Sequence, residues 1–397
     1  MRVCAVICEF DPLHKGHEHL LRSARAAGAE CIICVMSGAF CQRGEPSSFD
    51  RSTRTEAALS AGADLVLELP FPYSCASAEF FAQGAVSIIK ALGGVDTLAF
   101  GCECADVSAL CGCAAALTSD EFSAEYARVV ECERQLGTAA QIQKALEGIS
   151  PEHAPLLSGA NNTLAIEYIK ATMRMGLDIE FFPVARVGSG HGEMSEETEF
   201  ASASLIRSCL REGKDVSRYL PDSVAPIIKK AAEAEGALPS LYFAERAIIS
   251  HMRSGADGVP CAGAEGGLYR RLCDASIRAR SLDELINLSK TKKYTDARLR
   301  RTIIFSMCGV MSDDLRAEVS YIRLYGANTR GLEFLASVKK SISLPFISNP
   351  SMLKTLRDER SLRQIELCSR AESLRSLCQA RIGEADAELR MPPIIVK

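Results

Sequence analysis

The first 215 residues of the chain alternate between short apolar runs and longer amphipathic segments. The apolar runs cover residues 3–7, 31–36, 64–69, 96–100 and 178–184. The segments between them place apolar side chains three and four positions apart, which is the period of a helix with one buried face. Neighbouring parallel strands need a crossover connection that is usually a helix. The pattern therefore predicts an α/β fold built on a parallel sheet.

This alternation is interrupted once and then ends. Residues of about 105–150 have a helical, charged pattern without a strand, which predicts a helical insertion. Beyond about residue 215 the strand pattern disappears, and helical segments separated by turns follow. The sequence therefore predicts an α/β domain over residues 1–215 and a mostly α-helical C-terminal domain over residues 216–397.

The turn after the first apolar run carries the clearest chemical signal in the chain. Pro12 prevents the strand from continuing, and Gly16 lets the backbone approach a ligand closely. The helix that begins here presents unpaired N–H groups, to which anions bind. His14 and His17 add donors at this point, in a chain with only 6 histidines. We interpret the turn as a site for nucleotide phosphates; the alternative is a surface turn with two solvated histidines.

The composition is that of a globular protein. The chain is 47% hydrophobic, and no apolar stretch reaches the roughly 18 residues that span a bilayer. The N-terminus has no signal-like segment, so we expect a cytoplasmic protein without a membrane partner. The 17 cysteines are scattered through apolar runs, which favours reduced, buried thiols over disulfides.

Two groups of cysteines have spacings that suggest metal binding. Cys31 and Cys34 form a CxxC pair inside an apolar run, without a second pair at zinc-site spacing. The second group has no histidine nearby and consists of Cys102, Cys104, Cys111 and Cys113. We expect core packing rather than a metal site in both cases.

Charge is concentrated in one segment of a mildly acidic chain. The net charge is −4, unlike that of a strongly basic nucleic-acid-binding domain, and no DNA partner is expected. Within residues 290–301, however, only Asp296 opposes six cations: Lys290, Lys292, Lys293, Arg298, Arg300 and Arg301. Such a patch can bind RNA phosphates. The alternative is a solvated helical face. Nearby, Tyr321 and Tyr325 are candidates for stacking on bases or for core packing.

Other positions near strand ends are candidates for ligand contacts. Gly101 would let a flat base approach the backbone. Ser202, Ser204 and Arg207 place hydroxyl groups and a guanidinium at a helix start, where phosphate oxygens would fit. The alternative there is a capped helix with a surface arginine. In and after the loop of residues 37–46, three arginines are candidates for phosphate or carboxylate contacts: Arg43, Arg51 and Arg54.

The HxGH arrangement at residues 14–17 resembles the signature of the nucleotidylyltransferases, Rossmann-like enzymes that attack the α-phosphate of ATP and release pyrophosphate. Together with residues 36–46 and 62–70, it makes the chain resemble one family in particular, the bacterial tRNA(Met) cytidine acetate ligases. The likeness continues at Gly101, Asn161, Asn162 and Arg186 and through residues 294–301. It weakens after about residue 330.

The resemblance implies an ATP-dependent ligase that activates acetate as acetyl-adenylate and acetylates the N4 amine of the wobble cytidine in elongator tRNA(Met). Mg²⁺ would accompany ATP. His14 and His17 would be catalytic, and the helical domain would bind tRNA through Lys292, Lys293, Arg298 and Arg301. The residues that would contact ATP are Ile7, Cys8, Glu9, Phe10, Asp11, Pro12, Leu13, His14, Lys15, Gly16, His17, Glu18, His19, Leu20, Gly101, Asn161 or Asn162, Arg186, Ser202, Ser204 and Arg207.

Two other functions remain open from the sequence. One is a different adenylyltransferase that acts on a small-molecule phosphate; the long helical second half with its basic segment argues against it. The other is an RNA-binding protein without catalysis. Both histidines, Gly101 and the serines before Arg207 argue against that, because RNA binding alone needs no ATP pocket.

Overall fold

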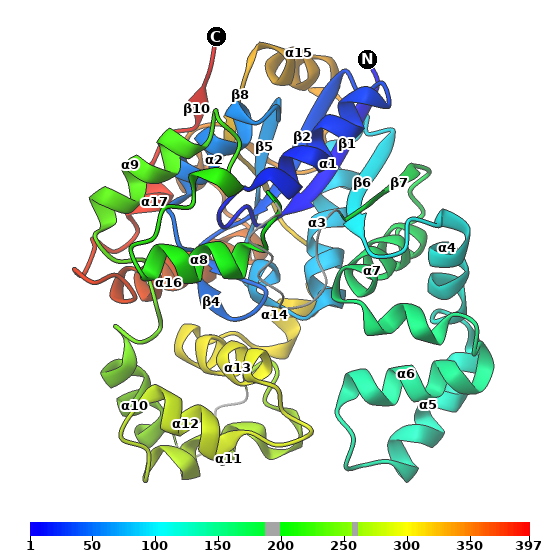
Figure 1. The fold of residues 1–397 in the computed structure, drawn as a ribbon, viewed down its shortest axis with the longest axis vertical. Coiled ribbons are helices and arrows are strands. Elements are labelled where there is room, and N and C mark those ends of the chain that lie inside the picture. Colours follow the sequence, from blue (N-terminus) through cyan, green and yellow to red (C-terminus); the bar gives the residue numbers. More distant parts are fainter. Residues whose placement is uncertain (187–198, 256–260) are drawn as a thin grey trace.

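A computed structural model describes residues 1–186, 199–255 and 261–397 (Figure 1). Within these ranges, eight strands form one sheet in the order β10-β8-β5-β2-β1-β6-β7, with β9 paired to β8. Five of them are mutually parallel: β1 (Val3–Cys8), β2 (Cys31–Ser37), β5 (Leu65–Leu69), β6 (Thr97–Cys102) and β7 (Glu180–Ala185). Each lies within two residues of a predicted apolar run. The predicted parallel α/β sheet is therefore confirmed.

Helices cover both faces of this sheet, because successive side chains of each strand point to opposite sides. One face is covered by α3 (Ala78–Leu92), α4 (Val107–Ala116), α7 (Ala160–Arg174) and α15 (Thr329–Val338). The other is covered by α1 (Lys15–Ala26), α2 (Arg51–Ser60), α8 (Ala203–Arg211) and α9 (Ala225–Glu235).

Further helices lie below the sheet in Figure 1, at the end away from both chain termini. α5 (Asp120–Cys132) and α6 (Thr138–Ile149) follow α4 in the segment predicted as a helical insertion. A third apolar core joins α10 (Glu245–Ser254), α11 (Leu268–Ser276), α12 (Leu282–Ser289), α13 (Asp296–Cys308) and α16 (Glu359–Leu377). This core also contains Phe40 and Phe71, which follow β2 and β5. The helical region therefore packs on the loops at the carboxyl ends of the strands.

Short elements complete the described chain. They are the hairpin strands β3 (Phe40–Cys41) and β4 (Glu45–Pro46), helices α14 (Ser312–Arg316) and α17 (Ala387–Arg390), and 3-10 turns at Tyr73–Cys75, Ala154–Ser158, Ser217–Tyr219, Glu265–Gly267 and Pro350–Thr355.

The expectation that strands end near residue 215 is wrong. The sheet continues with β8 (Ile322–Ala327), β9 (Phe346–Ile347) and β10 (Ile394–Ile395), and β8 pairs antiparallel with β5. The charge of Arg323 breaks the apolar pattern of β8, but inside the protein its guanidinium lies 3.8 Å from the Glu68 carboxylate. The division of the chain at residue 215 stays a prediction, and its second part is not entirely helical.

The tyrosines flanking Arg323 belong to the core. Tyr321 and Tyr325 are fully buried, and the Tyr325 hydroxyl donates to Glu68 Oε1 at 2.9 Å. These rings have no free face for a base, so core packing is the correct interpretation of the two.

The cysteines are distributed through the same cores. All 17 are free thiols, Cys31 and Cys34 are fully buried, and Cys104 and Cys111 are half-buried. Within the described ranges, no group of three or more histidine, cysteine, aspartate or glutamate side chains could hold a metal ion. In the same ranges, no helix is long and apolar enough to cross a membrane.

Arg54 ties the ends of the central strands together. Its buried guanidinium donates to the carbonyl oxygens of Glu9 (3.1 Å), Ser37 (2.8 Å) and Gly38 (2.8 Å), and its Nε donates to that of Phe49 (3.1 Å). The expectation that Arg54 contacts a ligand is therefore wrong, because carbonyl groups occupy its donors.

Arg51 is structural for a related reason. It lies 4.9 Å from the Tyr325 ring centroid and donates to the Met391 carbonyl. Its Nη2 is thus engaged with the C-terminal segment, whereas its buried Nη1 has no hydrogen-bond partner among the described residues, so a ligand contact of Arg51 stays a prediction.

We expect Arg54→Met to lower the free energy of unfolding by about 3–5 kcal/mol, because it leaves several buried carbonyl groups unpaired. Arg22→Met is the matched control, since the Arg22 side chain is 77% exposed and pairs with Glu18 on its own helix. Chemical denaturation of both variants checks this. Equal stability of Arg54→Met and Arg22→Met would contradict the structural role of Arg54.

Candidate functional site

The N-terminus of α1 is built around two imidazoles. His14 is the N-cap, and its Nδ1 accepts the Gly16 N–H at 3.1 Å. His17 reaches back, and its Nδ1 accepts the His14 N–H at 3.3 Å. The two rings stack with centroids 3.8 Å apart. A Cβ on Gly16 would lie 2.9 Å from His14 Cε1, so only glycine fits beneath the capping ring.

These hydrogen bonds assign the proton on each ring. A neutral imidazole carries one N–H, and a nitrogen that accepts a hydrogen bond cannot carry it. Because both Nδ1 atoms accept, both protons lie on Nε2, for which the described residues provide no hydrogen-bond partner. Burial, together with the nearby cations of Arg186 and Arg207, lowers the pKa of His14 to about 3. Burial and the neighbouring His14 also lower the pKa of His17 well below its usual value. The pair is therefore neutral at pH 7.

The residues before this cap hold Arg207 beside it. Phe10 is fully buried and adopts a positive φ of 47°, which is rare for a bulky residue. Its ring packs on His17 at 5.1 Å. The next residue, Asp11, accepts from the Ser48 N–H (2.7 Å) and hydroxyl (3.0 Å). Arg207, from the second turn of α8, donates to the Asp11 carbonyl at 2.6 Å.

The start of α8 meets the same turn. Ser202 caps this helix by accepting the Leu205 N–H at 3.2 Å. The Ser204 hydroxyl accepts from Arg207 at 3.4 Å and from Arg43 at 3.5 Å. The structure thus brings Ser202, Ser204, Arg207 and the exposed Arg43 to the turn that holds His14.

The β3–β4 hairpin closes the other side of the turn. The Gln42 N–H donates to Glu9 Oε1 at 2.7 Å. Burial raises the pKa of Glu9, and the nearby Asp11 carboxylate raises it further. The Glu45 carboxylate on β4 lies 3.7 Å from the Arg207 guanidinium.

A second cluster joins the end of β6 to the start of α7. The Glu103 carboxylate accepts the backbone N–H groups of Asn161 (3.1 Å) and Asn162 (2.6 Å). In return, the Asn162 side-chain oxygen accepts the Glu103 and Cys104 N–H groups, both at 2.9 Å. Asn162 is buried, and its side-chain oxygen and backbone N–H both belong to this link. Of the two asparagines, Asn161 is the one whose side chain reaches outward.

Asn161 and Arg186 meet at the edge of this cluster. The Arg186 guanidinium donates to the Asn161 side-chain oxygen at 3.0 Å. Among the described residues, a Cβ on Gly101 would meet only Arg186 Cγ, at 3.8 Å, so their packing does not require glycine there. The residues that follow Arg186, up to residue 198, lie outside the described residues.

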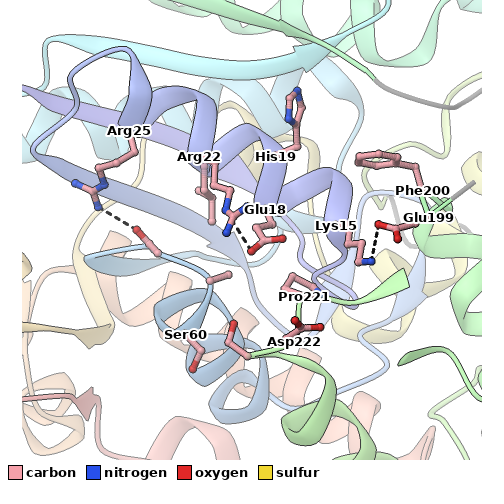
Figure 2. A pocket seen from close by; sticks show the side chains of 14 residues that line it. Lys15, Glu18, His19, Arg22, Arg25, Ser60, Glu199, Phe200, Pro221 and Asp222 are labelled. Atoms are coloured by element: carbon pink, nitrogen blue, oxygen red, sulfur yellow. Dashed lines mark hydrogen bonds and ion pairs between the residues drawn. The ribbon is translucent and has the colours of Figure 1, made fainter. Parts of the chain in front are cut away.

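Part of the predicted ATP-contacting stretch faces elsewhere. Lys15, Glu18 and His19 line a groove of about 760 Å³ beside α1. At 100° per residue, these three side chains share one face of α1, and His17 points to the opposite side. Figure 2 shows the groove with Lys15 directed at Glu199, at 2.8 Å. The structure therefore does not bring these three residues to the histidine pair.

The predicted tRNA-contacting residues lie on and before α13, and their surroundings differ. Lys292 is exposed, whereas Lys293 and Arg298 lie 5.8 and 5.3 Å from the Tyr294 ring centroid. Arg301 donates to the Gln42 carbonyl at 2.9 Å and so binds the hairpin beside the histidine site.

The α5–α6 loop reaches the same basic segment. A Cβ on Gly137 would lie 3.2 Å from the Lys293 carbonyl oxygen. The helical insertion therefore touches the basic segment directly.

Sequence reasoning missed the residues that organise this site. Glu45, Ser48 and Glu103 hold the functional side chains through ion pairs or hydrogen bonds. Glu103 directly follows a predicted strand, which was a usable signal. The positions of Glu45 and Ser48 depend on contacts between distant segments, for which the sequence has no local signature.

Comparisons with known proteins all find the same family. The profile of the HIGH nucleotidyl transferase family matches residues 1–388. The tRNA(Met) cytidine acetate ligase of Syntrophotalea carbinolica is 36% identical, over 89% of this chain and 86% of that protein. The ligase of the same name from Thermoanaerobacter sp. is 33% identical, over 89% of this chain and 90% of that protein.

Two crystal structures of Thermotoga maritima TmcAL share the fold. The apo form superposes with a TM-score of 0.92 at 28% identity and covers 100% of both chains. The form bound with alpha-thio ATP has a TM-score of 0.90 at 28% identity and covers 100% of this chain and 99% of that one.

The hydrogen bonds predict how the histidine pair responds to pH. Because both folded-state pKa values are depressed, we expect His14 and His17 to stay neutral, with the proton on Nε2, from pH 8 down to pH 5. The unfolded chain binds these protons near pH 6.5, so both residues reduce stability progressively as the pH falls below that value. Imidazole ¹⁵N spectra, assigned with His14→Gln and His17→Gln, report the tautomer directly. A titration midpoint above pH 5 for either ring would contradict the assignment.

Proposed function

The chain belongs to the HIGH nucleotidyl transferase family and, within it, to the tRNA(Met) cytidine acetate ligases; from this premise we propose that it activates acetate with ATP and transfers the acetyl group to tRNA(Met). The acceptor is the N4 amine of the wobble cytidine of elongator tRNA(Met). The observation that carries the proposal is the neutral histidine pair at the N-terminus of α1, with both Nε2–H groups available as donors.

The first half-reaction needs charge stabilisation rather than a base. Acetate is ionised at pH 7, because carboxyl pKa values lie near 4. One of its oxygens attacks the α-phosphorus, the bond to the bridging oxygen breaks, and pyrophosphate leaves with that electron pair. Negative charge on the phosphates grows in the transition state, where His14, His17 and the N–H groups of α1 can stabilise it. Neutral rings with a fixed tautomer suit this role, since they donate at every physiological pH.

Arg207 supplies a fixed positive charge beside the turn. Its side chain is 11% exposed and lies at the start of α8, so solvent screens it weakly. We place the leaving pyrophosphate between the α1 and α8 N-termini. Mg²⁺ would enter with ATP as part of the substrate, because the described residues contain no acidic cage for it.

The adenosine end would lie at the β6–α7 cluster. Gly101 leaves open space there, and Arg186 and Asn161 present polar groups at its edge. These are the positions that the family resemblance assigns to ATP. The Thermotoga maritima structure with alpha-thio ATP supports nucleotide binding by this fold.

In the second half-reaction, the cytidine N4 attacks the acetyl carbonyl carbon, the bond to the phosphate oxygen breaks, and AMP leaves while N4 loses a proton. The cytidine must be unstacked to reach the site, which a single-stranded anticodon loop permits. The basic segment of residues 290–301 supports RNA binding near this site, because Arg301 touches the hairpin that contacts Glu9.

The proposal is tested by incubating methionine tRNA with the protein, ATP and labelled acetate, followed by nucleoside analysis and measurement of pyrophosphate. His14→Ala and His17→Ala should each slow acetate-dependent pyrophosphate release by about 10²–10³-fold, the usual cost of removing a preorganised donor. His251→Ala is the control, because His251 bonds Ser306 in the helical region. Normal release by both site variants would refute the role of the pair, and absence of acetylcytidine with the parent protein would refute the function.

The basic segment gives a separate prediction. Lys292→Ala/Lys293→Ala should reduce the salt dependence of tRNA binding by slightly less than one unit of slope for each phosphate that these lysines neutralise. Acetate-dependent pyrophosphate release without tRNA should persist, which shows that the variant is folded. Lys339→Ala/Lys340→Ala removes a comparable exposed lysine pair after α15 and serves as the control. If the salt dependence of tRNA binding is the same for the two double variants, the basic segment is a solvated face and does not bind tRNA phosphates.

A further inference from the structure

Glu45 lies between two arginines that belong to different parts of the chain. Its Oε1 accepts from Arg300 Nη1 on α13 at 3.0 Å, and its Oε2 lies 3.7 Å from Arg207 Nη2 on α8. The Glu45 side chain is 30% exposed, so it is screened only in part. One carboxylate thus offsets two positive charges, one at the ATP site and one on the helix of the basic segment.

The hairpin that carries Glu45 is pressed firmly against α13. Gly44 has a φ of 70°, and a Cβ there would lie 2.8 Å from both Arg300 Cβ and the Arg301 nitrogen. Arg301 also donates to the Gln42 carbonyl at 2.9 Å. These contacts fix the backbone of α13 relative to the hairpin. The distance between Glu45 and Arg300 is therefore set by packing and not by the ion pair alone.

The two Nη atoms of Arg207 have different partners. Its Nη1 is anchored on the Asp11 carbonyl at 2.6 Å and lies 3.8 Å from the Asp11 carboxylate. Its Nη2 lies 3.4 Å from the Ser204 hydroxyl and 3.7 Å from the Glu45 carboxylate. Among the described residues, Glu45 is the carboxylate nearest to Nη2, and it therefore influences where that half of the guanidinium points. A carboxylate at 3.7 Å attracts the group without occupying its donors in a close hydrogen bond.

We propose that Glu45 is a positioning residue for the adenylation step: it orients Arg207 toward the phosphates, and its ion pair with Arg300 limits how strongly it competes with those phosphates. This inference rests on the proposed ATP site. It assigns to Arg300 an effect on ATP binding that acts through Glu45.

Two single variants should change the kinetics in different ways. Glu45→Gln keeps the side-chain shape but removes the charge, so Arg207 is free but poorly oriented. We expect kcat for acetate-dependent pyrophosphate release to fall about tenfold, with a KM for ATP no higher than that of the parent. Arg300→Ala leaves the full charge of Glu45 acting on Arg207. We expect the KM for ATP to rise about threefold, and Arg300→Lys, which keeps the cation, to restore it in large part.

The double variant provides the decisive measurement. In the Glu45→Gln background, Arg300→Ala should have no further effect on the KM for ATP, because the carboxylate through which it acts is gone. Arg360→Ala is the matched control: this arginine forms a 3.7 Å ion pair with Glu318, away from the hairpin. All assays omit tRNA, and melting curves accompany each variant.

The outcomes separate this inference from the proposed function. If the parent shows no acetate-dependent pyrophosphate release, the proposed function itself fails. The parent could instead be active while Arg300→Ala raises the KM for ATP equally with Glu45 and with Gln at position 45, or not at all. Either result would refute the proposal that Arg300 acts on ATP binding through the Glu45 carboxylate. A higher KM for ATP in Glu45→Gln, with unchanged kcat, would make Glu45 a simple structural contact and would also overturn the inference.

Discussion

The site depends on how the first helix is capped. An α-helix leaves its first N–H groups without partners, and most helices use a serine, threonine, asparagine or aspartate to accept one of them. Here an imidazole does so, because His14 accepts the Gly16 N–H through Nδ1. The same bond fixes the ring's proton on Nε2. The hydrogen bond that caps the helix is therefore also the one that sets the proposed catalytic N–H group of His14. Gly16 makes room for the His14 ring, because it has no Cβ.

Neutrality of the histidine pair follows from its surroundings. The two rings are stacked at 3.8 Å, and Arg207 and Arg186 lower the pKa of His14 in addition to burial. Two protonated rings at this separation would repel each other strongly. The positive charge of the site is therefore carried by arginines, which keep it at any physiological pH, while the histidines contribute directed N–H groups.

The sequence predicts the parts of this protein that have a local signature. The five parallel strands have continuous apolar runs because both faces of the sheet are covered, and the turn with His14 is recognisable from a few residues. β8 is the counterexample. Its Arg323 looks incompatible with a buried strand until Glu68, from a strand more than 250 positions away, is placed beside it. A buried pair of opposite charges cannot be inferred from either segment alone.

The same limit applies to the arginines of the site. Arg43, Arg51 and Arg54 look alike in sequence, near a loop that follows a strand. In the structure, Arg54 binds the carbonyl groups at the ends of β1 and β2, whereas Arg43 reaches Ser204 at the start of α8. What distinguishes them is burial and the direction of each side chain on its element. Those properties follow from packing and not from residue type.

The C-terminal segment, which the family profile matches up to residue 388, is connected to the site by a short series of contacts. Arg375 on α16 donates to the Ser47 carbonyl at 3.2 Å, and the adjacent Ser48 N–H donates to the Asp11 carboxylate at 2.7 Å. The Asp11 carbonyl in turn accepts from Arg207. To keep this contact, Arg375 must hold its position and have its buried charge compensated by a carboxylate. Glu388 supplies that carboxylate at 2.9 Å. The surrounding tail can therefore change in sequence while the support of the site is kept, provided that this buried pair and the strand pairing of β8 and β10 are retained.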